Sequence, residues 1–223
     1  MTTSPTTTSA TSHGLSTLQL FGLLTILSLM LAWANNEFVM TREVLLALAG
    51  GPQNAVQLDK QYEIVQRMQV WGYAMAPLQT LVRIGLAALV IQLMCLLGGA
   101  DIGFRKIFRI STVAFGALLF GSFLQVVWIV RQPSAAITRA SLGIVPDSLA
   151  AWFGTVNEAP SFFYLALNRV SITSLLWTML IYWGLRETRQ LRPMGAAIVT
   201  AATWSLVGAL HVITSLFMRG LVS

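Results

Sequence analysis

Residues 74–97, AMAPLQTLVRIGLAALVIQLMCLL, and residues 110–130, ISTVAFGALLFGSFLQVVWIV, decide the fold of this chain. They are long apolar stretches joined by a short basic loop, GGADIGFRKIFR, at positions 98–109. Each stretch has more than 20 residues. A helix of that length, rising ~1.5 Å per residue, crosses a ~30 Å hydrocarbon core. The pattern therefore predicts transmembrane helices.

Three further stretches repeat this pattern, at about 15–34, 162–185 and 194–217. The 223 residues are 56% hydrophobic and only 10% charged, whereas a soluble domain carries about 25% charged residues. The missing charge indicates that most of the surface faces lipid. We expect an all-α polytopic membrane protein, a bundle of five transmembrane helices within residues 15–223.

The first 14 residues, MTTSPTTTSATSHG, are rich in Ser and Thr and contain no Lys or Arg. They cannot bury enough apolar surface to fold, so residues 1–14 are predicted to be a disordered tail. The run that follows ends in Ala32-Trp33-Ala34, a small-x-small sequence typical of a signal-peptide cleavage site. A secretory signal needs basic residues before its apolar run, and we therefore expect a retained helix.

Residues 35–73 form the longest polar segment. Leu58, Tyr62 and Val65 recur there at helical spacing among charged and amide side chains. Two interpretations fit this pattern: a helix that lies on the bilayer and leads into the second span, or a helix packed on the outer face of the bundle. Pro77 is expected in the first turn of the second span, where its missing N–H has little effect.

The short loops predict the orientation. The loops at 98–109 and 186–193 are both basic, with Arg105, Lys106, Arg109, Arg186, Arg189 and Arg192. Short basic loops stay on the cytoplasmic side, so we expect the N-terminus inside and the C-terminus outside, in a bacterial cytoplasmic (inner) membrane. The same bias accounts for the net charge of +6. The expected partners are the lipid bilayer and other membrane protein subunits, and no nucleic acid.

No enzyme motif is present: the chain lacks HExxH, CxxC, GxSxG and the P-loop. Its single cysteine, Cys95, rules out an internal disulfide and a cysteine metal cluster. A thiol within an apolar run is also expected to be unreactive. We predict a non-enzymatic protein without catalytic, cofactor-binding or metal sites.

Polar residues within the spans are the best candidates for a site. Ionisable groups at membrane depth cost ~2.5–3.5 kcal/mol on insertion scales and usually face the protein interior. The predicted topology places five polar residues at a similar level in the outer half: Gln79, Arg83, Gln125, Asn168 and His211. One interpretation is a polar pocket for a lipid head group or an anion. The other is contact between helices, with Arg83 and Arg169 extending to the outer boundary.

Several features are shared with a known family. They are Pro77, the Gly98-Gly99 break, Phe104-Arg105-Lys106 opening the third span and Gly184-Leu185 closing the fourth. In these features residues 60–217 resemble the bacterial branch of the Yip (Ypt-interacting protein) family. The resemblance implies five helical spans and a cytosolic N-terminus. Eukaryotic members bind prenylated small GTPases and shape secretory membranes. This chain lacks their long polar N-terminal region, so a GTPase partner is not expected.

The sequence thus leaves two hypotheses for function. The first is a Yip-like integral membrane protein that organises a membrane or serves as an accessory subunit of a membrane complex. The second is a transporter or binding protein for a small solute or lipid, built on the outer-half polar residues. The chain shows no internal repeat, whereas many transporter folds consist of repeated halves. This difference favours the first hypothesis.

The predicted topology is testable with a cysteine at Arg189, in the loop between the last two spans. A membrane-impermeant thiol reagent should leave the Arg189→Cys variant unlabelled in intact cells and label it after the membrane is opened, because basic loops stay inside. Labelling in intact cells would contradict the orientation.

Overall fold

A computed structural model describes residues 15–48, 55–133, 137, 145–153 and 162–220 of the chain. Secondary structure in these residues is helical, apart from an isolated antiparallel bridge between Ser148 and Ser171. Four of the described helices are long and apolar enough to cross a membrane: 17–39, 62–97, 104–130 and 193–214. These helices confirm the all-α class and indicate a membrane protein. The predicted tail at 1–14 lies outside the described residues.

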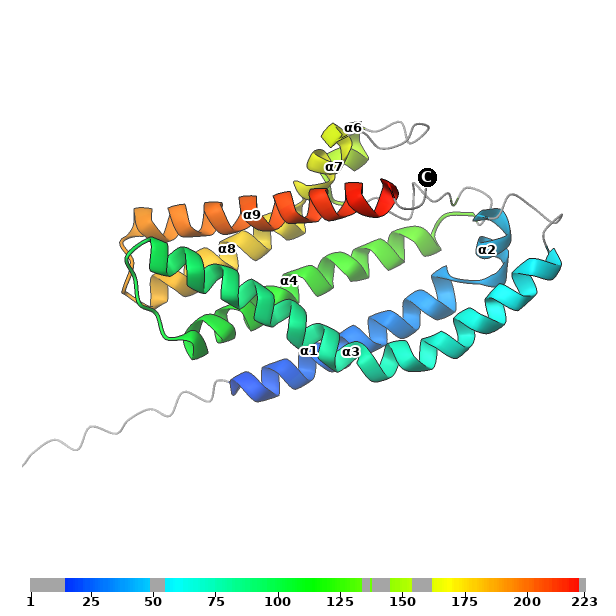
Figure 1. The fold of residues 1–223 in the computed structure, drawn as a ribbon, viewed down its shortest axis with the longest axis horizontal. Helices are drawn as coiled ribbons and strands as arrows, with labels where there is room; N and C mark the ends of the chain where they lie inside the picture. Colours follow the sequence, from blue (N-terminus) through cyan, green and yellow to red (C-terminus); the bar gives the residue numbers. More distant parts are fainter. Residues whose placement is uncertain (1–14, 49–54, 134–136, 138–144, 154–161, 221–223) are drawn as a thin grey trace, which may run out of the picture.

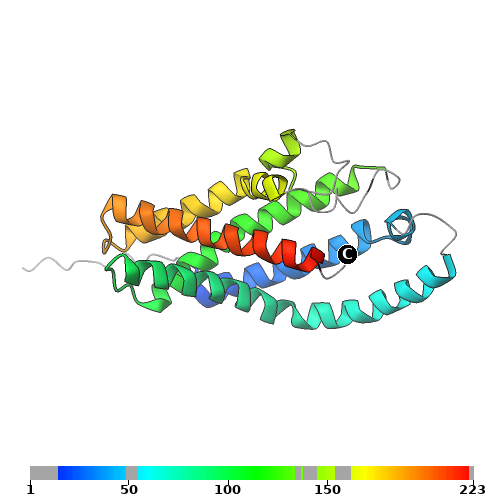
Figure 2. The same ribbon diagram turned by 45° about the horizontal axis from the view of Figure 1, so that its top comes forward.

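The helices follow one another along the chain with short connections. In order, they are α1 (Thr17–Ala34), the π-helix η1 (Asn35–Val39), α2 (Arg42–Leu48), α3 (Ala55–Leu97), α4 (Phe104–Val130), α6 (Leu149–Phe153), α7 (Phe162–Arg169), α8 (Ile172–Glu187) and α9 (Pro193–Gly220). Helices α1, α3, α4, α8 and α9 run along the long axis of the molecule (Figures 1 and 2). The turns from α3 to α4 and from α8 to α9 lie at the same end, which we call the basic end.

Helix α3 is longer than the sequence pattern predicted. It has 43 residues and is therefore ~65 Å long, about twice the thickness of a hydrocarbon core. The amphipathic segment around Tyr62 continues into the apolar stretch without interruption. The placement of Pro77 in a first turn was wrong, because Pro77 lies inside this helix.

The helix bends along its length (Figure 1). Proline lacks an N–H and its ring crowds the preceding turn, which bends a helix at an interior position. In the turn before Pro77, the Tyr73 hydroxyl accepts a hydrogen bond from Asn36 Nδ2 at 2.9 Å. This contact ties the bent region to η1.

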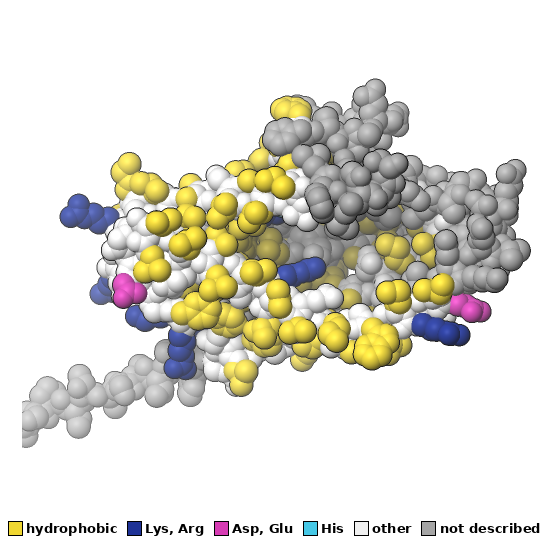
Figure 3. Space-filling view, viewed as in Figure 1, with side chains coloured by type: hydrophobic (Ala, Val, Ile, Leu, Met, Phe, Trp, Pro, Cys, Tyr) yellow, Lys and Arg dark blue, Asp and Glu magenta, His cyan; other side chains and the backbone are white. Residues whose placement is uncertain are grey.

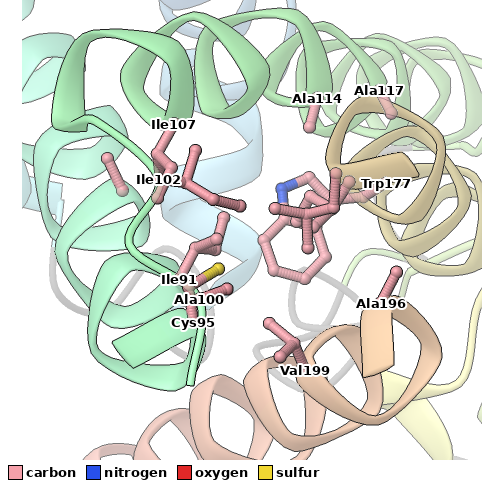
Figure 4. Packing of buried hydrophobic residues seen from close by; sticks show 13 residues of the cluster. Ile91, Cys95, Ala100, Ile102, Ile107, Ala114, Ala117, Trp177, Ala196 and Val199 are labelled. Carbon is pink, nitrogen blue, oxygen red and sulfur yellow. The ribbon is translucent and has the colours of Figure 1, made fainter. Parts of the chain in front are cut away.

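One face of α3 packs into the protein. Its buried residues recur every three or four positions: Ala76, Thr80, Ile84, Ala88, Ile91 and Cys95. Toward the middle of the helix, Ile84 packs with Leu24 of α1 and Phe115 of α4. Toward the basic end, Ile91 and Cys95 belong to the largest cluster, with Trp177 of α8 and Val199 of α9 (Figure 4). Cys95 is a buried core residue, and its thiol is fully covered.

Helices α4 and α8 are held together by two glycines, one in each helix. A Cβ at Gly121 of α4 would lie 2.9 Å from Thr173 Oγ1 of α8, and a Cβ at Gly184 of α8 would lie 2.7 Å from Ile110 Cγ2 of α4. At these distances an added Cβ would force Thr173 or Ile110 to shift. The two helices therefore approach closely both near the start of α8 and near its end.

The stretch predicted as a single span at 162–185 is interrupted in the structure. Helix α7 ends at Arg169 and α8 begins at Ile172. With 16 residues, α8 is ~24 Å long, which is less than the ~30 Å hydrocarbon core. The apolar composition of this stretch predicted its length but not its break.

The close approach at Gly184 predicts a steric effect. Gly184→Ala should lower the free energy of unfolding by about 1–3 kcal/mol, the usual range for overpacking. Thermal unfolding in detergent measures the change. Gly85→Ala is the control, since nothing lies within 4 Å of its Cβ position. That variant should be neutral or gain up to about 1 kcal/mol from the lower backbone entropy of alanine.

A second variant tests the cause. Combining Gly184→Ala with Ile110→Ala should restore part of the loss, giving a non-additive double-mutant cycle. Additive effects would mean that the two helices are not in contact at this point.

Candidate functional site

The break between α7 and α8, at residues 170–171, lies next to Asn168 and Arg169, two of the polar residues considered above. Ser171 has an extended backbone (φ −128°, ψ 158°) and forms the N-cap of α8. Its hydroxyl accepts from the Ser174 N–H at 3.0 Å, and Ser174 Oγ accepts from the Ser171 N–H at 3.1 Å. This reciprocal pair is a capping box, which favours a helix start at this position.

A loop segment supplies the hydrogen bonds that the break removes from the helix. The Leu149 N–H donates to the Val170 carbonyl at 2.9 Å, and the Ile172 N–H donates to the Asp147 carbonyl at 3.3 Å. The carboxylate of Asp147 accepts from the Thr173 N–H through Oδ2 at 2.7 Å. Irregular backbone at membrane depth requires such partners within the protein. Segment 145–149 therefore stabilises the break.

The start of α8 has no free donors for an anion. Its first N–H groups donate to Asp147 and Ser171, and the Leu175 N–H donates to the Ser171 carbonyl. Asp147 also places a negative charge at the positive end of the helix. Interrupted membrane helices often bind anionic substrates through such ends. Here the protein itself occupies that position.

Asn168 takes part in the same structure. Its Oδ1 accepts from the Val145 N–H and from the Ser148 hydroxyl, each at 3.0 Å. The contacts fix the end of α7 to the loop segment. Asn168 thus has a structural role in joining α7 to segment 145–149.

The opposite side of α7 faces α9. The Arg169 side chain lies over Gly208, with Cγ 3.6 Å and Nε 3.9 Å from the position of a Cβ there. His211, one turn further along α9, lies within electrostatic range of Arg169. The absence of a side chain at Gly208 leaves room for the guanidinium between the two helices.

This contact between α7 and α9 contains a buried hydrogen-bond donor of Arg169, and α9 carries a second one at Trp204, about one turn from Gly208. Arg169 Nε and Trp204 Nε1 are buried, and neither has a hydrogen-bond partner in the part of the chain that the structure describes. Trp204, Gly208 and His211 follow one face of α9 at spacings of four and three. Indole and guanidinium N–H groups only donate. The site would suit a ligand that supplies acceptor oxygens.

The structure brings some of these polar residues together, and the others differ in burial. Arg169 and His211 approach each other, and Asn168 immediately precedes Arg169 in sequence. Gln125 is partly buried in α4. Gln79 and Arg83 lie at exposed positions of α3, away from its buried face. A common site for all five residues stays a prediction.

Sequence reasoning missed Asp147 and Trp204. Asp147 lies in a loop, and nothing in its local sequence indicates that it reaches the start of a helix distant in sequence. Ser171-Ile172-Thr173-Ser174 carried a weak signal, since Ser followed three residues later by a polar side chain is typical of a helix start. Apolar residues on both sides obscured it.

The chain was compared with protein-family models, curated proteins and solved structures, and none of them matches. The resemblance to the Yip family therefore stays a prediction. Within the described residues, no three His, Cys, Asp or Glu side chains are grouped to hold a metal ion.

The role of Asp147 can be measured directly. Asp147→Ala should lower the free energy of unfolding by about 1–3 kcal/mol, because it leaves the Thr173 N–H without a partner. Asp147→Asn retains an acceptor oxygen, so its free energy of unfolding should fall by less. Thermal unfolding in detergent compares both with Asp101→Ala, which removes an exposed carboxylate. If Asp147→Ala and Asp101→Ala behave alike, the carboxylate does not stabilise the break.

Proposed function

We propose that this chain is a non-enzymatic protein of the bacterial cytoplasmic membrane, Yip-like in organisation, that serves as an accessory subunit of a membrane complex. The proposal includes five crossings arranged as a bundle, with the N-terminus inside. Four crossings correspond to the long apolar helices. Helices α7 and α8 together would supply the fifth.

Support for the fifth crossing comes from the packing of α8 against α4. Thr173, in the first turn of α8, meets Gly121 in the second half of α4, and Gly184 near the end of α8 meets Ile110 near the start of α4. Helix α8 therefore runs antiparallel to α4. It returns the chain to the basic end, where α4 begins and where α9 starts.

The observation that carries the proposed function is the exposed polar stripe on α3. Gln79 and Arg83 are one turn apart on this helix and both are exposed. The residues around them are apolar and also exposed: Leu78, Leu81, Val82 and Leu86. Arg83 precedes the end of α3 at Leu97 by 14 residues, or ~21 Å along the axis. This depth lies inside a ~30 Å hydrocarbon core.

A charge and an amide on a lipid-facing surface are unfavourable at that depth. Insertion scales give ~2.5–3.5 kcal/mol for an arginine at the centre of a membrane helix. A second protein that places acceptor groups against Gln79 and Arg83 would offset this energy, and hydrogen bonds between membrane helices contribute ~0.6–2 kcal/mol each. We therefore assign this face of α3 to contact with another subunit.

A second candidate function rests on the buried donors of Arg169, in the contact between α7 and α9, and of Trp204 on α9. Neither has a hydrogen-bond partner among the described residues, and both would suit an anionic head group or solute. In that case the chain would bind or transfer a small ligand, and the α3 stripe would only face lipid.

A photoreactive residue at Leu86, which follows Gln79 and Arg83 on the same face, tests the accessory role. In native membranes it should give one discrete protein adduct, and Arg83→Leu should reduce that adduct at least tenfold. Arg67→Leu, an exposed arginine further out on α3, is the matched control and should leave the adduct unchanged. Adducts with lipid alone, together with a raised melting temperature for Arg83→Leu, would overturn the proposal. Loss of a co-purifying small ligand in Arg169→Leu would favour the second candidate.

A further inference from the structure

At the basic end, helices α4 and α8 form an open pocket of about 520 Å³. Its lining includes Lys106, Arg109, Val113, Leu180, Trp183 and Glu187. Its floor is the close contact between Gly184 and Ile110. Figure 3 shows Lys and Arg side chains gathered at this end of the molecule.

Each helix contributes a stripe that changes from charged to apolar along its length. On α4, Lys106 and Arg109 lead to Val113 at spacings of three and four. On α8, Glu187 leads back to Trp183 and Leu180 at similar spacings. The charged ends of both stripes lie toward the turns, and the apolar ends lie toward the middle of the molecule. The pocket thus has a polar rim and an apolar wall.

The three charges at the rim are not paired with one another. Lys106, Arg109 and Glu187 are exposed, and no hydrogen bond or ion pair joins them in the described part of the chain. Two cations and one carboxylate therefore face the same opening. Helix α4 also begins beside the pocket, at Phe104, without a side-chain N-cap. Its first N–H groups add positive potential at the rim.

We propose that this pocket binds an aminophospholipid, with phosphatidylethanolamine as the simplest example. The site requires the proposed membrane placement of the basic end but not the accessory role. Lys106 and Arg109 contact the phosphodiester, and Glu187 contacts the ammonium group of the head group. One acyl chain follows Val113 and Leu180 into the hydrocarbon layer. Trp183 lies at the interface, the position that tryptophan prefers in membranes.

The carboxylate decides between classes of lipid. Basic pockets between membrane helices on the cytoplasmic side commonly bind anionic head groups. Phosphatidylglycerol carries the same phosphodiester but has a neutral glycerol in place of the ammonium group, so it would leave Glu187 without a cationic partner. A zwitterionic head group matches all three charges at once, and charge-assisted hydrogen bonds of both signs are then available.

The test uses the whole chain, purified in detergent and stripped of lipid. The protein is titrated with phosphatidylethanolamine or phosphatidylglycerol, and native mass spectrometry counts the bound lipid molecules. The wild-type protein should bind one phosphatidylethanolamine at least fivefold more tightly than phosphatidylglycerol. The double variant Lys106→Gln with Arg109→Gln should bind each lipid at least tenfold more weakly. Arg105→Gln is the matched control, a neighbouring exposed arginine that does not line the pocket, and should leave binding unchanged.

Glu187→Gln provides the decisive measurement. This variant should bind phosphatidylethanolamine more weakly and phosphatidylglycerol more tightly than the wild-type protein does, which reverses the preference. An unchanged preference in Glu187→Gln would overturn the proposal, as would equal weakening by Arg105→Gln. If the double variant does not fold, Glu187→Gln alone decides, since it changes a single exposed side chain. Tighter binding of phosphatidylglycerol by the wild-type protein would show a simple cationic site instead.

Discussion

The close approach of α4 and α8 is the contact on which the rest of the structure depends. Gly121 and Gly184 allow the two helices to meet at both ends of α8. Between them, Trp177 and Ile181 reach the core shared by α3, α4 and α9. In a membrane, where lipid is as apolar as leucine, helices associate through such close packing rather than through the hydrophobic effect. Small residues therefore determine the arrangement of these helices, and large apolar residues fill the space around it.

The break before α8 follows from this packing. Thr173 lies against Gly121 and at the same time donates its N–H to Asp147. One turn of helix thus connects α4, α8 and the loop segment 145–149. Because the backbone groups at the break have partners in that loop, no ligand is needed to satisfy these groups. The polar residues near the break therefore have a structural role. Asn168 is the clearest case, since its side chain joins α7 to segment 145–149.

The two ends of the molecule differ in their chemistry. The largest apolar cluster lies toward the basic end, where α3, α4, α8 and α9 meet. At that end the unpaired charges surround an open pocket. Further along the helices, exposed Gln79 and Arg83 face outward from α3, while Arg169 of α7 and Trp204 of α9 carry buried donors. In the part of the chain that the structure describes, each of these places has polar groups that no contact satisfies, and this is the basis of the proposals above.

The sequence by itself determined the class of protein. Long apolar runs, scarce charge and helical spacing were sufficient to predict the helices α1, α3, α4 and α9, because each pattern is local and depends only on the solvent that the helix meets. The buried face of α3 and the position of Cys95 within it required the tertiary structure, since apolar side chains facing lipid and facing protein look alike in sequence. The tertiary structure also decided the break at Ser171, the partner of Asp147 and the approach of Arg169 to His211. These features depend on contacts between segments distant in the chain, which no local pattern specifies.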